Sequence, residues 1–342
     1  MHIIASLPLD GPAYTVSVWA YAGFVSVVLA LLALDLGVFH RRAHAPSLRE
    51  SIGWTALWVS VGLAFGGAVA YLYEHHFMGL GNAVPVVGSP DKTVTLGGME
   101  AGGIYLTAYL LEKTLSMDNV FVIAMIFTSL GVPAAYQHRV LFWGIVGALI
   151  MRGIMIAVGA TLIAAFSWTV YVFGGLLVIS ALKVAVSREE VHDVESSRLV
   201  RLMSRLLPIS KELDGQKLVS RIGGRWHGTP LLVALIVVEA ADLMFAVDSV
   251  PAVFSLTADP FIVFTSNAFA ILGLRAMYFL LGGAREKFHY LSHALGAILI
   301  FVGIKMTVSH WYHMPTLASL GVIVLILALA IVFSIRKAKQ EA

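Results

Sequence analysis

The chain has 342 residues, of which 59% are apolar and only 13% are charged. Soluble domains carry about 25% charged residues, so this composition excludes an ordinary soluble protein and indicates a polytopic membrane protein. The formal net charge of +3 excludes no class by itself, but the absence of cysteine excludes disulfides, thiolate metal sites and cysteine nucleophiles.

Apolar segments long enough to cross a bilayer, about 20 residues each, occur nine times along the chain. They lie at roughly 15–39, 52–73, 100–130, 138–164, 167–184, 230–256, 261–283, 290–309 and 316–335. The sequence therefore predicts an all-α membrane protein with nine transmembrane helices. No basic stretch precedes an apolar run at the N-terminus, so we do not expect a cleaved signal peptide.

Basic residues concentrate in alternate connections between these segments. They are Arg41, Arg42 and Arg49 after the first segment, Arg139 before the fourth, nine residues from Lys183 to Arg225, Arg285 and Lys287 after the seventh, and Arg336, Lys337 and Lys339 after the ninth. Cytoplasmic connections carry the excess of Lys and Arg. The N-terminus is therefore predicted outside and the C-terminus in the cytoplasm.

The connection at about 184–229 is the longest and has mixed charge. Within it, RLVRLMSRLLPI (198–209) has Leu and Val at helical spacing with Arg between them. This pattern predicts an amphipathic helix on the cytoplasmic membrane surface. A solvated linker helix that only orients the two halves of the protein is the alternative.

Five carboxylates lie deep inside two of the apolar segments. Glu112 and Asp118 belong to the third segment, and Glu239, Asp242 and Asp248 belong to the sixth. A charged side chain at the centre of a membrane helix costs about 3 kcal/mol on insertion scales. Cations, protons or a water-filled cavity must therefore compensate these five acids, and a cation pathway is the first hypothesis.

The two acidic motifs are copies of one pattern. Glu112-x-x-x-Ser116-x-Asp118-Asn119 aligns with Asp242-x-x-x-Ala246-x-Asp248-Ser249, Arg152 aligns with Arg275, and Phe173–Val184 aligns with Leu295–Met306. Repeat one then covers about 100–184 and repeat two about 230–309, within a single transmembrane domain in which helices 1, 2 and 9 are peripheral. The distribution of basic residues predicts that the two repeats cross the membrane in opposite directions. Many secondary transporters have this architecture, and their substrate sites lie near the midplane of the membrane.

The donors in these motifs are hard oxygens. Besides the five carboxylates, they comprise the supporting polar side chains Ser116, Asn119, Ser249 and Asn267, the last of which can instead make a helix–helix hydrogen bond. Such oxygens suit Mg²⁺, Mn²⁺ or Ca²⁺. Met117 and Met244 adjoin the motifs, and a thioether ligand would favour Mn²⁺; filling of apolar space is their alternative role.

Counter-charges are available for the acids. Arg152 and Arg275 either compensate the empty cluster and release it when a cation binds, or pair statically with one carboxylate each. If Lys113 also pairs with an acid, the whole set could be structural. Asp35, near the cytoplasmic end of the first segment, is a gating acid or a partner of the arginines that follow it. Clustered buried carboxylates favour protonation, so protons and a divalent cation would compete for the same oxygens.

Three stretches together resemble the TerC family of integral membrane proteins, most closely its Alx-type members. They are LALDLGVFHRR (32–42), EKTLSMDNVFV (112–122) and EAADLMFAVDSVPAVF (239–254). The resemblance implies a multi-pass protein of the bacterial inner membrane, related to the LysE-type transporter superfamily. Alx-type members are regarded as manganese exporters linked to alkaline stress. The resemblance places the family's intramembrane acids at Glu112, Asp118, Glu239, Asp242 and Asp248.

These inferences combine into one functional hypothesis. We expect a secondary transporter that exports Mn²⁺ across the bacterial inner membrane. The sequence has no GxSxG, HExxH or paired Ser/Lys signature that would suggest an enzyme. 

Protons are expected to move in exchange for Mn²⁺. The expected partners are therefore a divalent cation, protons and the lipid bilayer, and no nucleic acid. We expect neither an organic cofactor nor enzymatic activity. The alternative is a membrane stress or assembly scaffold of the tellurium-resistance type, without transport. The oligomeric state is left open.

Overall fold

The computed structural model describes residues 16–37, 47–186, 208–210, 213–281, 290–309, 311 and 314–340. Its helices are α1 (Val18–Gly37), α2 (Leu48–Glu74), η1 (Phe77–Gly79), α3 (Gly98–Ser129), α4 (Ala134–Ala165), α5 (Thr169–Val186), α7 (Pro230–Phe254), α8 (Pro260–Leu272), α9 (Leu274–Leu281), α10 (Leu291–Val308) and α11 (Thr316–Gln340). Two short hairpins accompany them, β1 (Val84–Val86) with β2 (Ser89–Val94), and β3 (Val219–Ile222) with β4 (Arg225–Gly228). The predicted all-α class is confirmed in its main feature, a largely helical membrane protein.

A helix lies in each of the nine predicted segments, and the seventh is divided between α8 and α9. Four helices, α1, α2, α4 and α7, are long and apolar enough to cross a membrane, and α8 with α9 gives a fifth candidate that bends by 43°. The apolar parts of α5, α10 and α11 are shorter. Nine membrane crossings therefore stay a prediction.

The composition of α3 explains why this 32-residue helix is not among the apolar spans. Every stretch of 18 residues within it contains at least three charged residues, drawn from Glu100, Glu112, Lys113 and Asp118. The charges that mark the third segment as unusual in the sequence thus also make α3 the least lipid-compatible of the long helices. They need partners inside the bundle.

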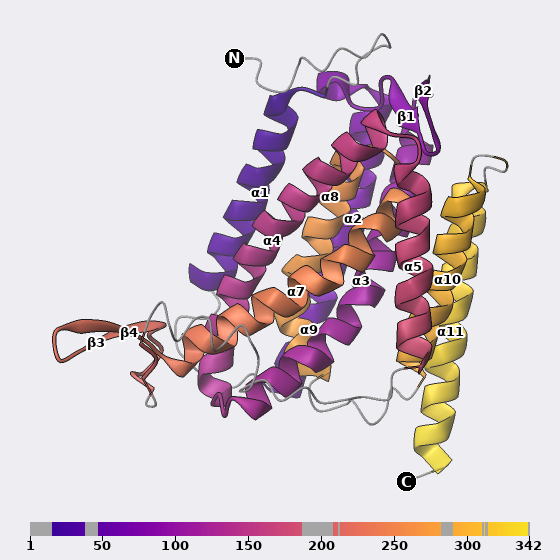
Figure 1. The fold of residues 1–342 in the computed structure, drawn as a ribbon. Coiled ribbons are helices and arrows are strands. Elements are labelled where there is room, and N and C mark those ends of the chain that lie inside the picture. Colours follow the sequence, from indigo (N-terminus) through magenta and orange to yellow (C-terminus); the bar gives the residue numbers. More distant parts are fainter. Residues whose placement is uncertain are drawn as a thin grey trace.

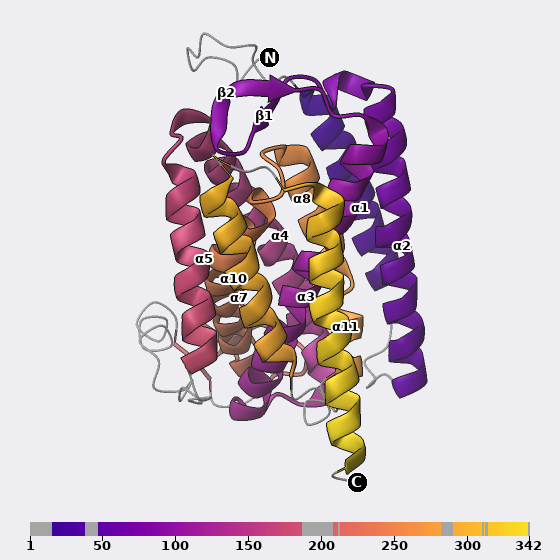
Figure 2. The ribbon, with the colours of Figure 1, turned by 90° about the vertical axis from the view of Figure 1, so that its right-hand side faces the viewer.

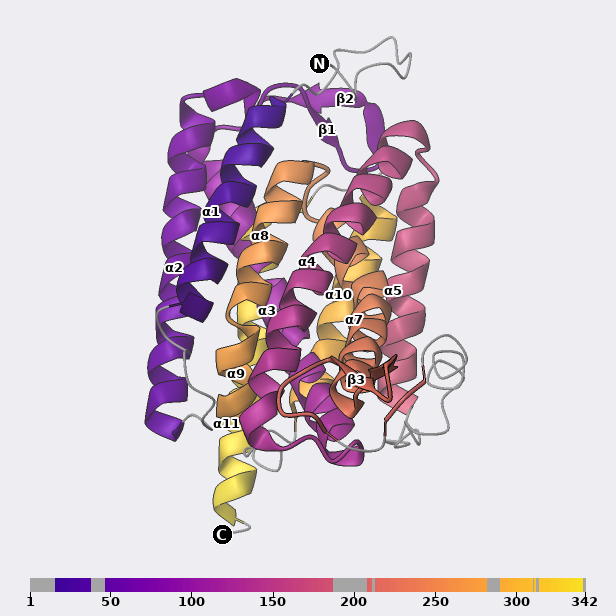
Figure 3. The same cartoon turned by 90° about the vertical axis from the view of Figure 1, so that its left-hand side faces the viewer.

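The helices form one bundle in which consecutive helices run in opposite directions, except that α9 continues α8 after a bend of 43° (Figures 1 and 2). α1 begins at the end of the bundle that carries the β1–β2 hairpin, and α11 ends at the opposite end. α8 lies in the interior and is buried along nearly its whole length, whereas α7 has one buried and one exposed face. Figure 2 shows α5, α10 and α11 along one side, and Figure 3 shows α1 and α2 along another.

Contacts between helices that are not consecutive in the chain hold the interior together. α3 packs against α8, α4 packs against α7, and α5 packs along α10. At the last interface two glycines face each other, because a Cβ on Gly174 would lie 3.2 Å from the carbonyl oxygen of Gly303 and a Cβ on Gly303 would lie 3.1 Å from that of Gly174. Small residues let membrane helices approach closely in this way.

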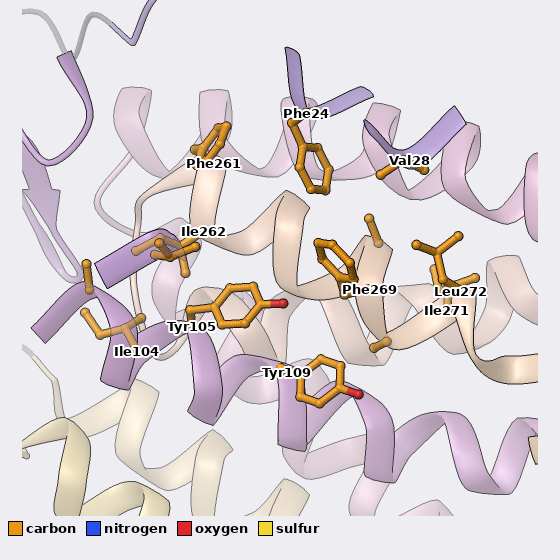
Figure 4. Close-up of a cluster of buried hydrophobic side chains, with 14 of the residues drawn as sticks. Phe24, Val28, Ile104, Tyr105, Tyr109, Phe261, Ile262, Phe269, Ile271 and Leu272 are labelled. Carbon is orange, nitrogen blue, oxygen red and sulfur yellow. The ribbon is translucent and has the colours of Figure 1, made fainter. Parts of the chain in front are cut away.

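An aromatic cluster fastens α8 to the first three helices (Figure 4). The rings of Phe24 and Phe261 meet edge to face at 6.0 Å, and those of Phe65 and Phe269 lie 4.5 Å apart. α1 contributes one face only, since Phe24, Val28, Leu32 and Asp35 recur at helical spacing and are buried. Its other face is exposed, as expected of a helix that borders lipid.

The β3–β4 hairpin was not predicted within the 184–229 connection. Its turn residues Gly223 and Gly224 have φ angles of +57° and +82°, the positive values that a two-residue type I′ turn requires. The pair of glycines between Ile222 and Arg225 was therefore a hairpin signal in the sequence. The amphipathic helix predicted at 198–209 lies outside the described residues, apart from its last two positions.

Candidate functional site

Arg152 is the centre of the polar interior. It lies midway along α4, and only 1% of its surface is exposed. Its guanidinium donates to a carboxylate oxygen of Glu112 on α3 and, through Nη2 and Nε, to both carboxylate oxygens of Asp242 on α7, at 3.0 and 3.3 Å. Charge-assisted, two-pronged contacts of this kind are the strongest hydrogen bonds that side chains make. One cation thus joins two acids from different helices.

Two neutral side chains complete the contacts of this guanidinium. Nη1 of Arg152 also donates to Oγ of Ser249 at 3.2 Å and to Oδ1 of Asn267 on α8 at 2.8 Å. Four helices therefore meet at a single side chain. We call Arg152, Glu112, Asp242, Ser249 and Asn267 the Arg152 cluster; every one of them is a sequence-predicted site residue.

The Arg152 cluster has unused hydrogen-bonding capacity. Within the described part of the chain, Oε2 of Glu112, Nδ2 of Asn267 and the nearby buried Oγ of Ser116 have no hydrogen-bond partner. A buried polar atom without a partner costs about 1–3 kcal/mol. With two carboxylates and one guanidinium, the cluster also keeps one net negative charge when both acids are ionised. Both features favour an additional cation or proton.

Asp248 lies apart from the Arg152 cluster, although it shares α7 with Asp242. Its carboxylate accepts a hydrogen bond of 2.5 Å from Oγ of Ser180 on α5. Residues six apart on a helix point about 120° away from each other, so α7 presents Asp242 to α4 and Asp248 to α5. Ser180 had no role in the sequence analysis, although a hydroxyl within the aligned block 173–184 was a signal that could have found it.

Glu239 packs its carboxyl group against α4 at Gly147, where a larger residue would require the carboxyl group to move. A Cβ built on Gly147 would lie 2.0 Å from Oε1 and 2.4 Å from the carboxyl carbon of Glu239. The Oε2 atom of Glu239 is buried and has no hydrogen-bond partner among the described residues. Gly147 therefore provides the space that this acid occupies.

Replacing Gly147 with alanine should displace Glu239 and destabilise the protein by about 1–3 kcal/mol, the usual cost of overpacking. The matched control is Gly175→Ala, because a Cβ on Gly175 of α5 meets nothing within 4 Å. Thermal unfolding of the two purified variants in detergent provides the comparison. If both unfold at the same temperature, Glu239 does not need the space at Gly147.

The remaining predicted donors on α3 are less well connected. Ser116 and Asn119 are buried but make no hydrogen bond to the Arg152 cluster among the described residues. The Asp118 side chain lies outside the described part of the structure, and only its place on α3 is given. Met244 is 64% exposed, which suits a lipid-facing side chain better than a thioether ligand.

The aligned arginine of the second repeat has a partner of its own. Arg275, at the start of α9, pairs with Asp35 of α1 at 2.5 Å, and both side chains are buried. A small pocket beside this pair is lined by aromatic residues of α2 and α9, among them Trp54, Trp58 and Phe279. The Asp35–Arg275 pair thus ties α9, the second half of the broken helix, to the C-terminal end of α1.

Among the described residues, Lys113 contacts the break between α8 and α9 and forms no ion pair with an acid. Its ammonium donates to the carbonyl oxygen of Ala270 at 3.1 Å, and a Cβ on Gly273 would lie 2.8 Å from the same nitrogen. A cation is favourable at the C-terminal end of a helix, where carbonyl groups lack partners. Lys113 therefore compensates the end of α8, a role that the sequence alone did not indicate.

The predicted cation ligands whose side chains the structure describes, Glu112, Glu239, Asp242 and Asp248, are not gathered around one point in this conformation. Among the described residues, no group of three or more His, Asp or Glu side chains could hold a metal ion. The reason is visible in the geometry: a guanidinium occupies the space between Glu112 and Asp242, while Asp248 and Glu239 face α5 and Gly147. The guanidinium therefore takes the place that a cation shared by Glu112 and Asp242 would occupy.

Comparisons with known proteins add an independent line of information. Residues 98–342 match the model of the integral membrane protein TerC family. The chain is 47% identical over 320 residues to the uncharacterized membrane protein STKORF319 of Myxococcus xanthus, covering 94% of this chain and 93% of that protein. It is 42% identical over 316 residues to Alx of Escherichia coli (strain K12), whose name describes a membrane-bound redox modulator, covering 92% and 93%. No solved structure matches significantly.

Proposed function

The chain belongs to the TerC family of integral membrane proteins, and from this premise we propose that it is a secondary transporter that exports Mn²⁺ across the bacterial inner membrane in exchange for protons. The observation that carries the proposal is the buried Arg152 cluster, in which one guanidinium lies between carboxylates of α3 and α7. Ionisable groups at this depth mark ion pathways more often than structural pairs.

The packing of the helices supports an inverted repeat. If 98–186 and 230–308 are two copies of one three-helix unit, a twofold axis exchanges α3 with α7 and α4 with the α8–α9 pair. The contact of α3 with α8 then becomes the contact of α7 with α4, and both contacts are present. α5 and α10 would exchange with each other, and they pack together. The Arg152 cluster lies where these units meet, which is where inverted-repeat transporters hold their substrate.

Arg152 acts in this proposal as a resident cation. When no cargo is bound, its guanidinium neutralises part of the charge of Glu112 and Asp242 and keeps the interior stable. A divalent cation that enters the cluster competes with the guanidinium and with protons for the same oxygens. Binding then releases the arginine and any protons held by the acids, and reprotonation from the outside releases the cation.

Each predicted residue has a role in this scheme. Asp118 and Asp248 are core ligands, and Glu112, Asp242 and Glu239 are ligands or proton carriers. Ser116, Asn119 and Ser249 complete the oxygen shell, and the Asp35–Arg275 pair gates one end. Hard oxygen donors suit Mn²⁺ without excluding Mg²⁺ or Ca²⁺, so the choice of Mn²⁺ rests on the family resemblance.

Uptake of radioactive Mn²⁺ into everted membrane vesicles tests the proposal. Vesicles from cells that produce the protein should accumulate Mn²⁺ when respiration acidifies their interior, and a protonophore should abolish the accumulation. Vesicles without the protein provide the baseline. Equal uptake in both preparations would overturn the proposed transport activity.

The name of the Escherichia coli relative favours a second candidate, a membrane-bound modulator or scaffold that does not transport ions. The chain has no cysteine, so it cannot modulate redox state by its own thiol exchange. A scaffold should tolerate the triple substitution Glu112→Gln, Asp242→Asn and Arg152→Gln, which removes the charges of the Arg152 cluster together, but lose function when the 184–229 connection is replaced by a flexible linker. A transporter should show the stronger defect with the triple substitution.

A further inference from the structure

The β3–β4 hairpin is buried near its base and exposed around its turn. Arg221 pairs with Trp226 across the strands and Val219 pairs with Gly228, so these four residues share a face. Trp226 is 62% exposed and Val219 is 37% exposed, whereas Gly228 at the base is buried. On the opposite face Ser220 is buried, while Ile222 and Arg225 beside the turn are exposed, so the turn end is exposed on both faces.

The position of the hairpin fixes its depth relative to a membrane. β4 ends at Gly228 and α7, a candidate membrane span, begins at Pro230. Trp226 is therefore four residues from the start of a span and must lie close to the membrane–water interface. The hairpin projects sideways from the bundle at the level of the lower helix ends (Figures 1 and 3). It thus lies where lipid headgroups surround the protein.

The charges of the hairpin complement an anionic surface. Arg221 and Arg225 are exposed, and the one acidic residue of the described part of the connection, Asp214, is paired with Lys217 at 2.9 Å. Two arginines therefore remain without an acidic partner among the described residues of the hairpin. Tryptophan prefers the headgroup region of a bilayer, and clustered basic residues beside a membrane span are attracted to anionic lipids.

We propose that the exposed part of the β3–β4 hairpin is a membrane-surface anchor that binds anionic lipid headgroups. Trp226 and Val219 enter the headgroup region, Arg221 contacts lipid phosphates on the same face, and Arg225 contacts them beside the turn from the opposite face. The anchor would hold the start of α7, the helix that carries Glu239, Asp242 and Asp248, at a fixed depth. The proposal does not depend on transport, because lipid binding follows from the hairpin alone.

The absence of cysteine makes a direct test possible with the full-length protein. Two variants, Trp226→Cys and Val219→Cys, each carry a single cysteine, which is labelled with an environment-sensitive fluorophore. Each labelled protein is reconstituted into phosphatidylcholine vesicles with or without phosphatidylglycerol. Lys92→Cys on the exposed β2 strand, in the other hairpin, is the matched control. Brominated lipids report contact with the bilayer by quenching.

Both hairpin labels should emit as in an apolar environment and be quenched by brominated lipids, more strongly with phosphatidylglycerol than without it. Combining Trp226→Cys with Arg221→Gln and Arg225→Gln should remove that difference, and the Lys92 label should show none. Water-like emission from both hairpin labels, or equal quenching with and without phosphatidylglycerol, would overturn the proposal. So would a signal that follows protein density in the vesicles, because it would indicate contact with a second copy.

Discussion

Replacing Arg152 with glutamine should lower the free energy of unfolding by about 3–5 kcal/mol, the cost of leaving a buried charge without its partner. The substitution leaves Glu112 and Asp242 facing each other in the interior with no guanidinium between them. Thermal unfolding in detergent measures the effect. Because a divalent cation could replace the lost charge, Mn²⁺ should raise the unfolding temperature of the variant more than that of the parent protein.

Removing the two acids provides the control for this prediction. In the Arg152→Gln background, Glu112→Gln with Asp242→Asn removes the uncompensated charges and should restore most of the stability. The restored protein should no longer respond to Mn²⁺. An Arg152→Gln variant as stable as its parent would mean that the guanidinium is not the counter-charge of the Arg152 cluster.

Replacing Asp248 with asparagine should reduce the initial rate of Mn²⁺ uptake into everted vesicles by about 100-fold, since loss of even an outer partner of a metal ligand typically costs 10–100-fold. An amide keeps the size of the side chain and the contact with Ser180 but removes the negative charge. We expect the same loss for Asp118→Asn. Ser180→Ala should have a smaller effect, about 10-fold, because it removes only the hydrogen bond that orients Asp248.

Asp214→Asn is the matched control for these substitutions. Asp214 is an exposed acid whose only described ion pair is with Lys217, so its loss should leave uptake unchanged. All variants should be compared at equal amounts of protein in the membrane. Normal uptake by Asp118→Asn and Asp248→Asn would show that the assigned residues do not bind the transported cation.

The positions of the helices could be predicted because each helix coincides with a long apolar run of the sequence. The break between α8 and α9 could not, since the residues around it, Ala270 to Leu274, are apolar and Gly273 resembles any glycine of a membrane helix. The space that Gly273 leaves is filled by Lys113 and Trp58, which come from α3 and α2. Only the packing of three helices determines that the chain bends at this point.

The candidate site was predictable in part for the same kind of reason. Ionisable residues in apolar segments identified Arg152, Glu112 and Asp242, which the structure brings together. The sequence could not divide the acids between different neighbours, because that division depends on how α7 is rotated against α4 and α5. Asp248 consequently meets Ser180, and Glu239 meets Gly147.

Proton movement in proteoliposomes tests the central claim most directly. Purified protein is reconstituted with a trapped pH indicator, and Mn²⁺, Mg²⁺ or Ca²⁺ is added outside at equal concentrations. The account predicts that Mn²⁺ entry drives protons out of the vesicles through the parent protein and not through Asp248→Asn. No proton movement with any of the three cations, in vesicles that contain folded protein, would contradict it.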